Sequence, residues 1–317
     1  AGNCMIWKPS PDTPFTGALI LECLIEAGLP PGVLSYLTGT SSEVGEALVR
    51  HPGIHAITFT GSTAVGRAIE LAGAQSGKRV QAEMGGVNPL VVLADADVAV
   101  AAAAAAEGAF GSTGQKCTAT RRALVESSVY DEFVEIVCAS AASRRLGDAQ
   151  EAQTELGPLV SERARALVAQ QVRELAAAGA RVVCGGAESP QPHLADGWYF
   201  EPTVIVDVPR SCELLDHEIF GPVLIIERVA DLADALGRIA QSEYGLAAGL
   251  FSDSHRSITQ FAAAVEAGLL AINLPTTGVE PQASFGGLKS SGNGSKEVGQ
   301  DALQFYTDEV TIALAVS

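Results

Sequence analysis

Apolar and polar positions alternate along this chain with two different periods. Short, nearly continuous apolar runs are typical of buried strands, whereas apolar side chains that recur every third or fourth position are typical of helices. In the first part of the chain this pattern predicts strands at Cys4–Trp7, Val33–Leu37, Ala56–Phe59 and Val80–Glu83. It predicts helices from about Pro14 to Ala27, from Glu43 to Arg50, and from Thr63 to about Ala72.

The segment Met84–Pro89 interrupts the pattern with two adjacent glycines and a proline, so we expect a domain junction there. Beyond it, strands are predicted at Leu90–Leu93, Ala123–Glu126, Arg181–Cys184, Thr203–Val206 and Leu224–Glu227. Helices are predicted at Ala96–Gly111, Tyr130–Ser143, Ser161–Ala178, Leu232–Gln241 and Ile258–Ala267. Strands that alternate with helices at this spacing indicate βαβ units, and the fold class is therefore α/β with a mostly parallel sheet.

The last part of the chain has a different character. Phe285–Gly299 is rich in glycine and is predicted to be a loop, whereas Gln304–Val316 alternates like a final strand. A chain of 317 residues exceeds a typical single domain, so we expect two packed units.

Charge and composition narrow the possible partners. The chain carries 37 acidic and 20 basic residues, and its formal charge of −17 makes nucleic acid and anionic lipid poor partners. The longest bland apolar stretch, Val98–Ala106, ends at a glutamate, so it indicates a buried helix and not a membrane span. The first residues show no signal-peptide pattern, which favours a cytoplasmic protein.

The six cysteines are scattered, without a CxxC pair or a cluster with histidine. We therefore expect neither a metal site nor a dense disulfide scaffold. Cys117 stands apart because it follows a long helix and a bend permitted by Gly114. A thiol near backbone N–H groups at such a bend can be stabilised as a thiolate and can attack a carbonyl carbon. Most cysteines are small buried hydrophobes, and we expect this of the other five.

Glu83 is the second candidate for chemistry. It ends a predicted strand and precedes two glycines, so its carboxylate lies where the backbone turns tightly. In an apolar neighbourhood such a carboxylate has a raised pKa and can act as a base, although an isolated glutamate is more often a surface residue. The third candidate is the strand-to-helix turn at Gly61 and Ser62, where N-terminal amides suit a phosphate group. A strand-to-helix turn of this kind more often has no role in binding.

Taken together these segments resemble the aldehyde dehydrogenase superfamily. Six motifs in one order carry the resemblance, from the first residue of the chain to the last: Trp-Lys-Pro-Ser with Lys8, Phe-Thr-Gly-Ser-Thr-Ala-Val-Gly, Glu-Met-Gly-Gly-Val-Asn-Pro, Gly-Gln-Lys-Cys-Thr, Glu-Ile-Phe-Gly-Pro-Val and Phe-Gly-Gly-Leu-Lys-Ser-Ser-Gly. The resemblance implies a partial Rossmann-type cofactor domain (1–85), an α/β catalytic domain (86–290), and a return to the cofactor domain with an oligomerisation strand (291–317).

The resemblance also implies roles for single residues. Cys117 would attack the aldehyde, and Glu83 would activate the water that hydrolyses the thioacyl-enzyme. The residues implied to bind NAD or NADP are Lys8, Ser10, Gly61, Ser62, Val65, Glu218 and Phe220. Phe285 would line the substrate funnel, and the protein would be a homodimer or homotetramer that acts on a small aldehyde.

Three departures from the family pattern stand out. Val87 occupies a position where lysine is frequent. Pro11 occupies a position where many NAD-preferring members carry glutamate, so NADP is expected to be accepted, with or without NAD. The family's oxyanion-hole asparagine and first strands precede the segment that matches Lys8, so this sequence lacks the family's N-terminal part, and we expect an exposed strand edge and apolar surface.

Three segments are similar to the α-ketoglutaric semialdehyde (2,5-dioxopentanoate) dehydrogenase branch: Gly-Gln-Lys-Cys-Thr-Ala-Thr-Arg, Ile-Asn-Leu-Pro-Thr-Thr-Gly-Val-Glu and the late Gly-Ser-Lys-Glu. This similarity implies a dicarboxylic semialdehyde as substrate. Lys116 is the candidate cation for its distal carboxylate; it can equally face solvent or bind a carbonyl. Arg121 and Arg122 are further candidates, and we expect one to point inward and the other outward. Alternatives are a succinate-semialdehyde or broad-specificity dehydrogenase, a CoA-acylating enzyme, a cysteine hydrolase, and an inactive truncated fragment.

Overall fold

The computed structural model describes residues 1–188 and 194–315. The chain divides into two compact units. The first comprises Ala1–Ala82, Glu280–Phe285 and the residues from Ser295 onward, and the second comprises Glu83–Val279 with Gly286–Gly294. Glu83 and the glycines that follow it therefore belong to the second unit.

The first unit contains two pairs of strands and several helices. Strands β1 (Met5–Trp7) and β2 (Leu34–Tyr36) pair in parallel, and β3 (Ala56–Thr60) pairs with β4 (Arg79–Glu83). The helices are α1 (Pro14–Glu26), a short π-helix η1 (Ser41–Gly45), α2 (Glu46–Arg50), α3 (Thr63–Ser76) and α9 (Asp301–Phe305). Proline at the first position favours the start of α1, and Gly77 at φ +66° ends α3 in the left-handed conformation.

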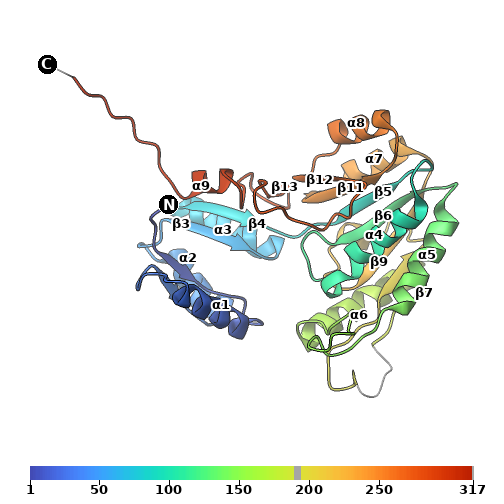
Figure 1. Cartoon of the computed structure of the whole chain (residues 1–317), viewed down its shortest axis with the longest axis horizontal. Helices are drawn as coiled ribbons and strands as arrows, with labels where there is room; N and C mark the ends of the chain where they lie inside the picture. The colour runs from blue at the N-terminus through green and yellow to red at the C-terminus, as the bar shows by residue number, and fades with distance from the viewer. Residues whose placement is uncertain (189–193, 316–317) are drawn as a thin grey trace. The chain divides into compact units, whose positions relative to one another are not determined.

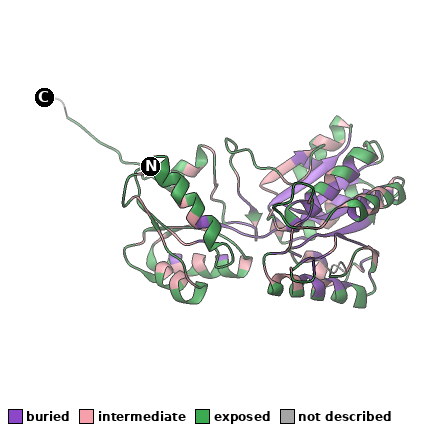
Figure 2. Cartoon of the chain, turned by 60° about the horizontal axis from the view of Figure 1, so that its bottom comes forward, coloured by how far each residue is buried: buried purple, intermediate pink, exposed green. Residues whose placement is uncertain are grey.

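Apolar side chains of α1 are exposed on more than one side of the helix. Phe15 and Ile25 are 74% and 57% exposed, and Leu19, Ile20 and Leu24 are also exposed. This agrees with the predicted exposure of apolar surface in the first unit. Figure 2 shows the same contrast, because buried residues are concentrated in the sheet of the second unit.

The second unit is built on a seven-stranded sheet of order β12-β11-β5-β6-β9-β8-β7. All neighbouring pairs are parallel except β7 and β8, which confirms the predicted α/β class. The strands are β5 (Asn88–Val92), β6 (Thr120–Glu126), β7 (Arg181–Cys184), β8 (Thr203–Val206), β9 (Val223–Val229), β11 (Ala247–Phe251) and β12 (Leu269–Ile272).

Helices cover both faces of this sheet (Figure 1). Ala123 and Val125 of β6 pack with α4 (Val98–Phe110) and α5 (Tyr130–Ser143). Leu124, between them, packs on the opposite face with α7 (Leu232–Gln241) and α8 (His255–Ala264). Helix α6 (Glu162–Ala177) packs with β8 and β9 in a third cluster. The alternation of side chains along β6 thus separates the two halves of the core.

Four strands differ from the sequence-based expectation. The strands β11 and β12 were not predicted; in β11, Ala-Ala-Gly-Leu-Phe shows no alternation and is buried on both faces. The two-residue strand β13 (Leu288–Lys289) lies within the predicted loop Phe285–Gly299 and pairs with β10 (Tyr244–Gly245), in a stretch for which no element was predicted.

The predicted final strand, Gln304–Val316, is wrong over its described part. Gln304 lies in α9, and residues 307–315 pair with no strand among the described residues; Val316 lies outside them. A strand exists only where its N–H and C=O groups meet a second strand. Among the described residues, no helix is long and apolar enough to cross a membrane.

Candidate active site

The segment that carries Cys117 is a tight turn between α4 and β6. A short 3-10 helix, η2 (Gly111–Gly114), contains Ser112 and Thr113 with φ of +53° and +57°. Gly114 follows at φ +65°, and a Cβ there would overlap the carbonyl group of Gly221. Only glycine fits this position, and the close approach fixes the turn against the loop that contains Gly221.

Arg121 lies beneath this turn and is buried. Its Nη2 donates to the carbonyl oxygens of Gly114 and Lys116 at 2.6 and 3.1 Å, and its Nη1 donates to that of Gly221 at 2.9 Å. Burial lowers the pKa of Arg121 to about 10, and the negative charges of Glu218 and Cys117 oppose that shift. The expected role of Arg121 as a cation for the substrate is therefore wrong, because its guanidinium is committed to backbone carbonyls.

Asn88 is a buried site residue that the sequence did not reveal. It is 1% exposed, and its Nδ2 donates to the carbonyl oxygens of Cys117 and Ala119 at 2.8 and 2.9 Å. Its Oδ1 accepts from the amide of Ala247 at 3.0 Å, which links the turn to β11. A polar side chain at the start of an otherwise apolar strand is the signal that could have identified it, since buried polar groups require partners.

The environment of Cys117 favours the neutral form of its thiol. Its pKa is raised by burial, then by the charges of Glu218 and Glu83, while the amides of Thr118 and Cys117 lower it. Desolvation and the two carboxylates thus oppose the expected thiolate, whereas the amides of the turn favour it. Attack on a carbonyl carbon therefore requires a base that removes the proton.

Glu83 is a buried carboxylate that acts on the Cys117 thiol. It is the last residue of β4, it is 2% exposed, and its Oε2 accepts from the amide of Gly287 at 3.0 Å. Its electrostatic effect on Cys117 brings these two predicted residues into one site within the second unit.

Glu218 supplies a second carboxylate to the same site. Its Oε1 accepts from the amide of Gly86 at 3.4 Å, and a Cβ at Gly85 would overlap its Oε2. Burial raises the pKa of Glu218, and Arg121 and the Gly86 amide oppose the shift. Phe220 follows in the same loop, with its ring 5.6 Å from the guanidinium carbon of Arg121. Arg121 thus links the loop that contains Glu218 and Phe220 to the turn that carries Cys117.

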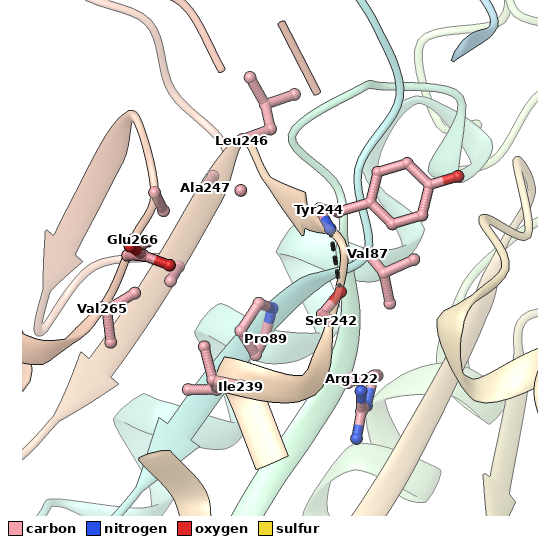
Figure 3. Close-up of a pocket in the computed structure, with 13 residues that line it drawn as sticks. Val87, Pro89, Arg122, Ile239, Ser242, Tyr244, Leu246, Ala247, Val265 and Glu266 are labelled. Atoms are coloured by element: carbon pink, nitrogen blue, oxygen red, sulfur yellow. Dashed lines mark hydrogen bonds between the residues drawn. The ribbon is translucent and has the colours of Figure 1, made fainter. Parts of the chain in front are cut away.

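Arg122 points to the other face of β6. Its Nε is 2.7 Å from Oε1 of Glu227, and its Nη1 is 3.6 Å from Asp216. It lines two cavities together with Val87, each with room for a water-sized molecule only. Figure 3 shows Arg122, Val87 and Tyr244 around the first of them. The expectation that one arginine points inward and the other outward is wrong, because both are buried, and Cys117 lines neither cavity.

The two candidate substrate residues lie at different places. Lys116 is exposed directly before Cys117, and its Nζ has no hydrogen bond or ion pair with any residue in the described ranges. Phe285 is half-buried in the first unit, where its backbone pairs with Glu297.

The remaining cofactor candidates belong to the first unit. Ser62 precedes the fourteen-residue helix α3 and makes no capping hydrogen bond with its side chain, and Val65 is 42% exposed on the first turn. A Cβ at Gly61 would crowd the ring of Phe59, so the backbone stays bare there. Lys8 Nζ donates to the carbonyl of Pro9 at 2.7 Å, and Ser10 Oγ accepts from the amide of Asp12 at 3.3 Å. An exposed helix N-terminus with an unused serine fits a phosphate group.

The expectation that the other cysteines are buried is wrong for two of them. Cys4 and Cys23 are exposed, and Cys138, Cys184 and Cys212 are partly buried. Helix α1 exposes apolar positions, and Cys23 lies among them.

Comparisons with known proteins agree with this geometry. The model of the aldehyde dehydrogenase family matches residues 1–312. The chain is 37% identical over 311 residues to the α-ketoglutaric semialdehyde dehydrogenase of Bacillus subtilis, which covers 98% of this chain and 64% of that protein. It is 39% identical over 315 residues to the 2,5-dioxopentanoate dehydrogenase of Saccharolobus solfataricus, with 98% and 65% covered.

A solved structure shares the fold. Betaine aldehyde dehydrogenase from Staphylococcus aureus, in complex with NAD⁺, has a TM-score of 0.92 and 32% identity, and the match covers 96% of this chain and 60% of that one. The chain thus spans slightly less than two thirds of the relatives that it matches. The extent of the family match and the identity to these relatives show that the chain belongs to the aldehyde dehydrogenase family.

Proposed function

We propose that the protein to which this chain belongs oxidises an aldehyde to a carboxylic acid with NAD⁺ or NADP⁺. The observation that carries the proposal is the partly buried thiol of Cys117, on which the carboxylates of Glu83 and Glu218 act. The sequence-based roles of these residues are consistent with their positions within the second unit.

The chemistry of the chain's own residues follows from the protonated thiol. Glu83 accepts the proton of Cys117, and the sulfur attacks the aldehyde carbon to form a thiohemiacetal. The nicotinamide, when bound, supplies the acceptor for the hydride that leaves this carbon. Cys117 then carries a thioester. Glu83 releases the thiol proton to solvent and then takes a proton from water. The resulting hydroxide attacks the thioester carbon, the carbon–sulfur bond breaks to release the acid, and the proton held by Glu83 returns to the sulfur to restore the thiol.

Cofactor binding is proposed for the residues to which the family resemblance assigns it. Lys8 and Ser10 would contact the adenosine ribose, and the turn at Gly61 and Ser62, with Val65 beside it, would hold the pyrophosphate at the start of α3. Glu218 would bind the nicotinamide ribose and Phe220 would flank that end. We further propose that residues 1–85 and 291–317 serve cofactor binding and oligomerisation and that residues 86–290 serve catalysis, in a cytoplasmic homodimer or homotetramer.

The proposed substrate is α-ketoglutaric semialdehyde, which would give 2-oxoglutarate. Two relatives at 37% and 39% identity bear names that specify this reaction, and Lys116 supplies an exposed cation next to the nucleophile. Succinate semialdehyde is the alternative substrate, because it also carries a carboxylate at one end and an aldehyde at the other, and differs from α-ketoglutaric semialdehyde only in the chain between them.

The experiment measures reduced cofactor at 340 nm with the native gene product that carries this sequence. We expect α-ketoglutaric semialdehyde to be oxidised with both cofactors, and Cys117→Ser to abolish turnover while the dissociation constant of the cofactor changes little. Cys212→Ser is the matched control. An enzyme that oxidises no aldehyde, or a Cys117→Ser variant that retains activity, would contradict the proposed function.

A further inference from the structure

Side chains bind the carbonyl oxygens of the turn on both sides of Cys117. Arg121 donates to the carbonyl of Lys116 at 3.1 Å, and Asn88 donates to that of Cys117 at 2.8 Å. Thr276 Oγ1 donates to the carbonyl of Thr118 at 2.8 Å. Three successive carbonyls are therefore held by three side chains from different strands and loops.

The first two contacts act on the peptide units that flank the nucleophile. In a planar trans peptide, the carbonyl of one residue and the N–H of the next point in opposite directions. A carbonyl of Lys116 that points to Arg121 therefore directs the N–H of Cys117 away from Arg121. In the same way, a carbonyl of Cys117 that points to Asn88 directs the N–H of Thr118 away from Asn88.

Both N–H groups act on the sulfur. The amides of Thr118 and Cys117 each lower the pKa of the Cys117 thiol, against burial and the two carboxylates. The third contact differs, because the peptide unit after the carbonyl of Thr118 carries the N–H of Ala119, which donates to the carbonyl of Lys116 at 3.1 Å. The contacts made by Arg121 and Asn88 thus affect the thiol, whereas the contact made by Thr276 does not.

We propose that Arg121 and Asn88 are positioning residues that orient the two peptide units around Cys117, so that the amides of Cys117 and Thr118 are directed to its sulfur. Neither side chain takes part in a chemical step. Both are almost fully buried, with 4% and 1% of their surface exposed, and each is held on a second side, Arg121 by Gly221 and Asn88 by Ala247. Their anchors lie outside the turn, so its peptide planes are fixed by the surrounding sheet and loops.

The consequence concerns the thiolate. Without these contacts the peptide units can rotate, and the sulfur loses amide hydrogen bonds that favour its charged form. The charged groups that act on the sulfur are Glu218, Glu83 and Arg121. The charge of Arg121 can favour the thiolate directly, and a variant that retains the charge separates this effect from orientation.

The test is the pH dependence of alkylation at Cys117, measured with iodoacetamide and mass spectrometry of the peptide that contains it. No substrate or cofactor is needed, so the result does not depend on the proposed function on which the inference builds. The variants are Asn88→Ser, whose hydroxyl is too short to reach the carbonyls, and Arg121→Lys, which keeps the charge and loses the planar fork. Thr276→Val removes a buried donor from the same turn and serves as the matched control.

We expect Asn88→Ser and Arg121→Lys to alkylate roughly three- to tenfold more slowly at neutral pH, which corresponds to a rise of about half to one unit in the pKa of Cys117. The limiting rate at alkaline pH should stay within about twofold, since the thiolate itself remains equally accessible. Thr276→Val should keep the parent profile.

Thermal unfolding identifies any variant that fails to fold, and the other variant then decides by the same measurement. The proposal is overturned if the folded Asn88→Ser and Arg121→Lys proteins have the pH profile of Thr276→Val. It is also overturned if all three variants shift alike, because the shift would then report general loosening of the turn.

Discussion

The amide of Gly287 donates a hydrogen bond of 3.0 Å to Oε2 of Glu83, although 204 residues separate the two in sequence. This contact fixes a carboxylate at the end of β4 while Cys117 follows a different element, α4 and its turn. A glutamine at position 83 can keep the acceptor for Gly287 and lose the basicity. The position therefore allows a substitution that tests chemistry with little change in structure.

We predict that Glu83→Gln slows hydrolysis of the thioester and lets the acylated enzyme accumulate. A rapid-mixing experiment should show a burst of reduced cofactor near one equivalent per site, followed by steady turnover that is about 10²- to 10⁴-fold slower than in the parent. If the thiol also depends on Glu83 for deprotonation, the burst rate falls and rises again with pH. A variant with the parent steady-state rate would remove Glu83 from the mechanism.

A second prediction concerns stability at acid pH. Arg238 donates to both carboxylate oxygens of Asp234, and these hydrogen bonds, with those from the Ala230 amide and Arg210, lower the pKa of Asp234 to about 2 from 3.8. Because the folded pKa is below the unfolded one, the stabilisation is complete above the unfolded pKa and is lost as pH falls toward the folded value.

Asp234→Asn should therefore lower the free energy of unfolding by about 2 kcal/mol at pH 7 and by much less near pH 2. Urea denaturation at a series of pH values measures the difference. Asp131→Asn is the control, because Asp131 pairs with Arg228 at 2.7 Å but its side chain is 86% exposed, and such pairs contribute less than about 1 kcal/mol. A deficit for Asp234→Asn that is independent of pH would contradict the prediction.

The third prediction concerns cofactor choice. Pro11 lies in an exposed turn closed by the hydrogen bond from the amide of Thr13 to the carbonyl of Ser10 at 3.1 Å. No carboxylate at this position opposes a 2′-phosphate, so we expect the native protein to accept NADP⁺. Pro11→Glu should shift the ratio of kcat/KM toward NAD⁺ by at least about tenfold, through like-charge repulsion. Pro11→Gln controls for loss of the proline, and strict use of NAD⁺ by the native protein would refute the reasoning.

The fourth prediction concerns the far end of the substrate. We expect the kcat/KM for α-ketoglutaric semialdehyde to exceed that for an uncharged aldehyde of equal length by at least about tenfold. One charged hydrogen bond to the distal carboxylate accounts for a difference of this size. Lys116→Met should narrow this gap, and Lys116→Arg should retain most of it. Equal narrowing by both variants would show that the charge of Lys116 is not what the substrate recognises.

The sequence predicted most of the fold because its strands and helices have clear apolar periods. The elements from β5 to β9 lie within a few residues of their predicted positions. Strand β11 was not predicted because a strand buried on both faces has no alternation, and Ala-Ala-Gly is not rich in strand-forming residues. The four-residue edge strand β12 was not predicted either. The strand predicted at the end of the chain had the right alternation, but pairing depends on a partner that periodicity does not contain.

The site shows a sharper limit. Cys117, Glu83 and Glu218, which the motif order singled out, all lie in the second unit, and both carboxylates act on the thiol. Arg121 and Arg122, in contrast, are the same residue type at adjacent positions, and their different tasks depend on which loops and strands flank β6. Arg121 donates to the carbonyl oxygen of Gly221, and Arg122 pairs with Glu227. Both partners lie about 100 residues away along the chain, so the local sequence does not indicate them.

The bare backbone at Gly85 has a consequence for how this site tolerates change. Glu218 occupies the space that a side chain at Gly85 would need. Substitution of Gly85 by alanine would therefore displace the carboxylate of Glu218 without removing any reactive group, so a residue that has no chemistry of its own would still affect the site. The loss should be partly repaired by shortening its neighbour, Glu218→Asp, so the two positions are expected to vary as a pair and not independently.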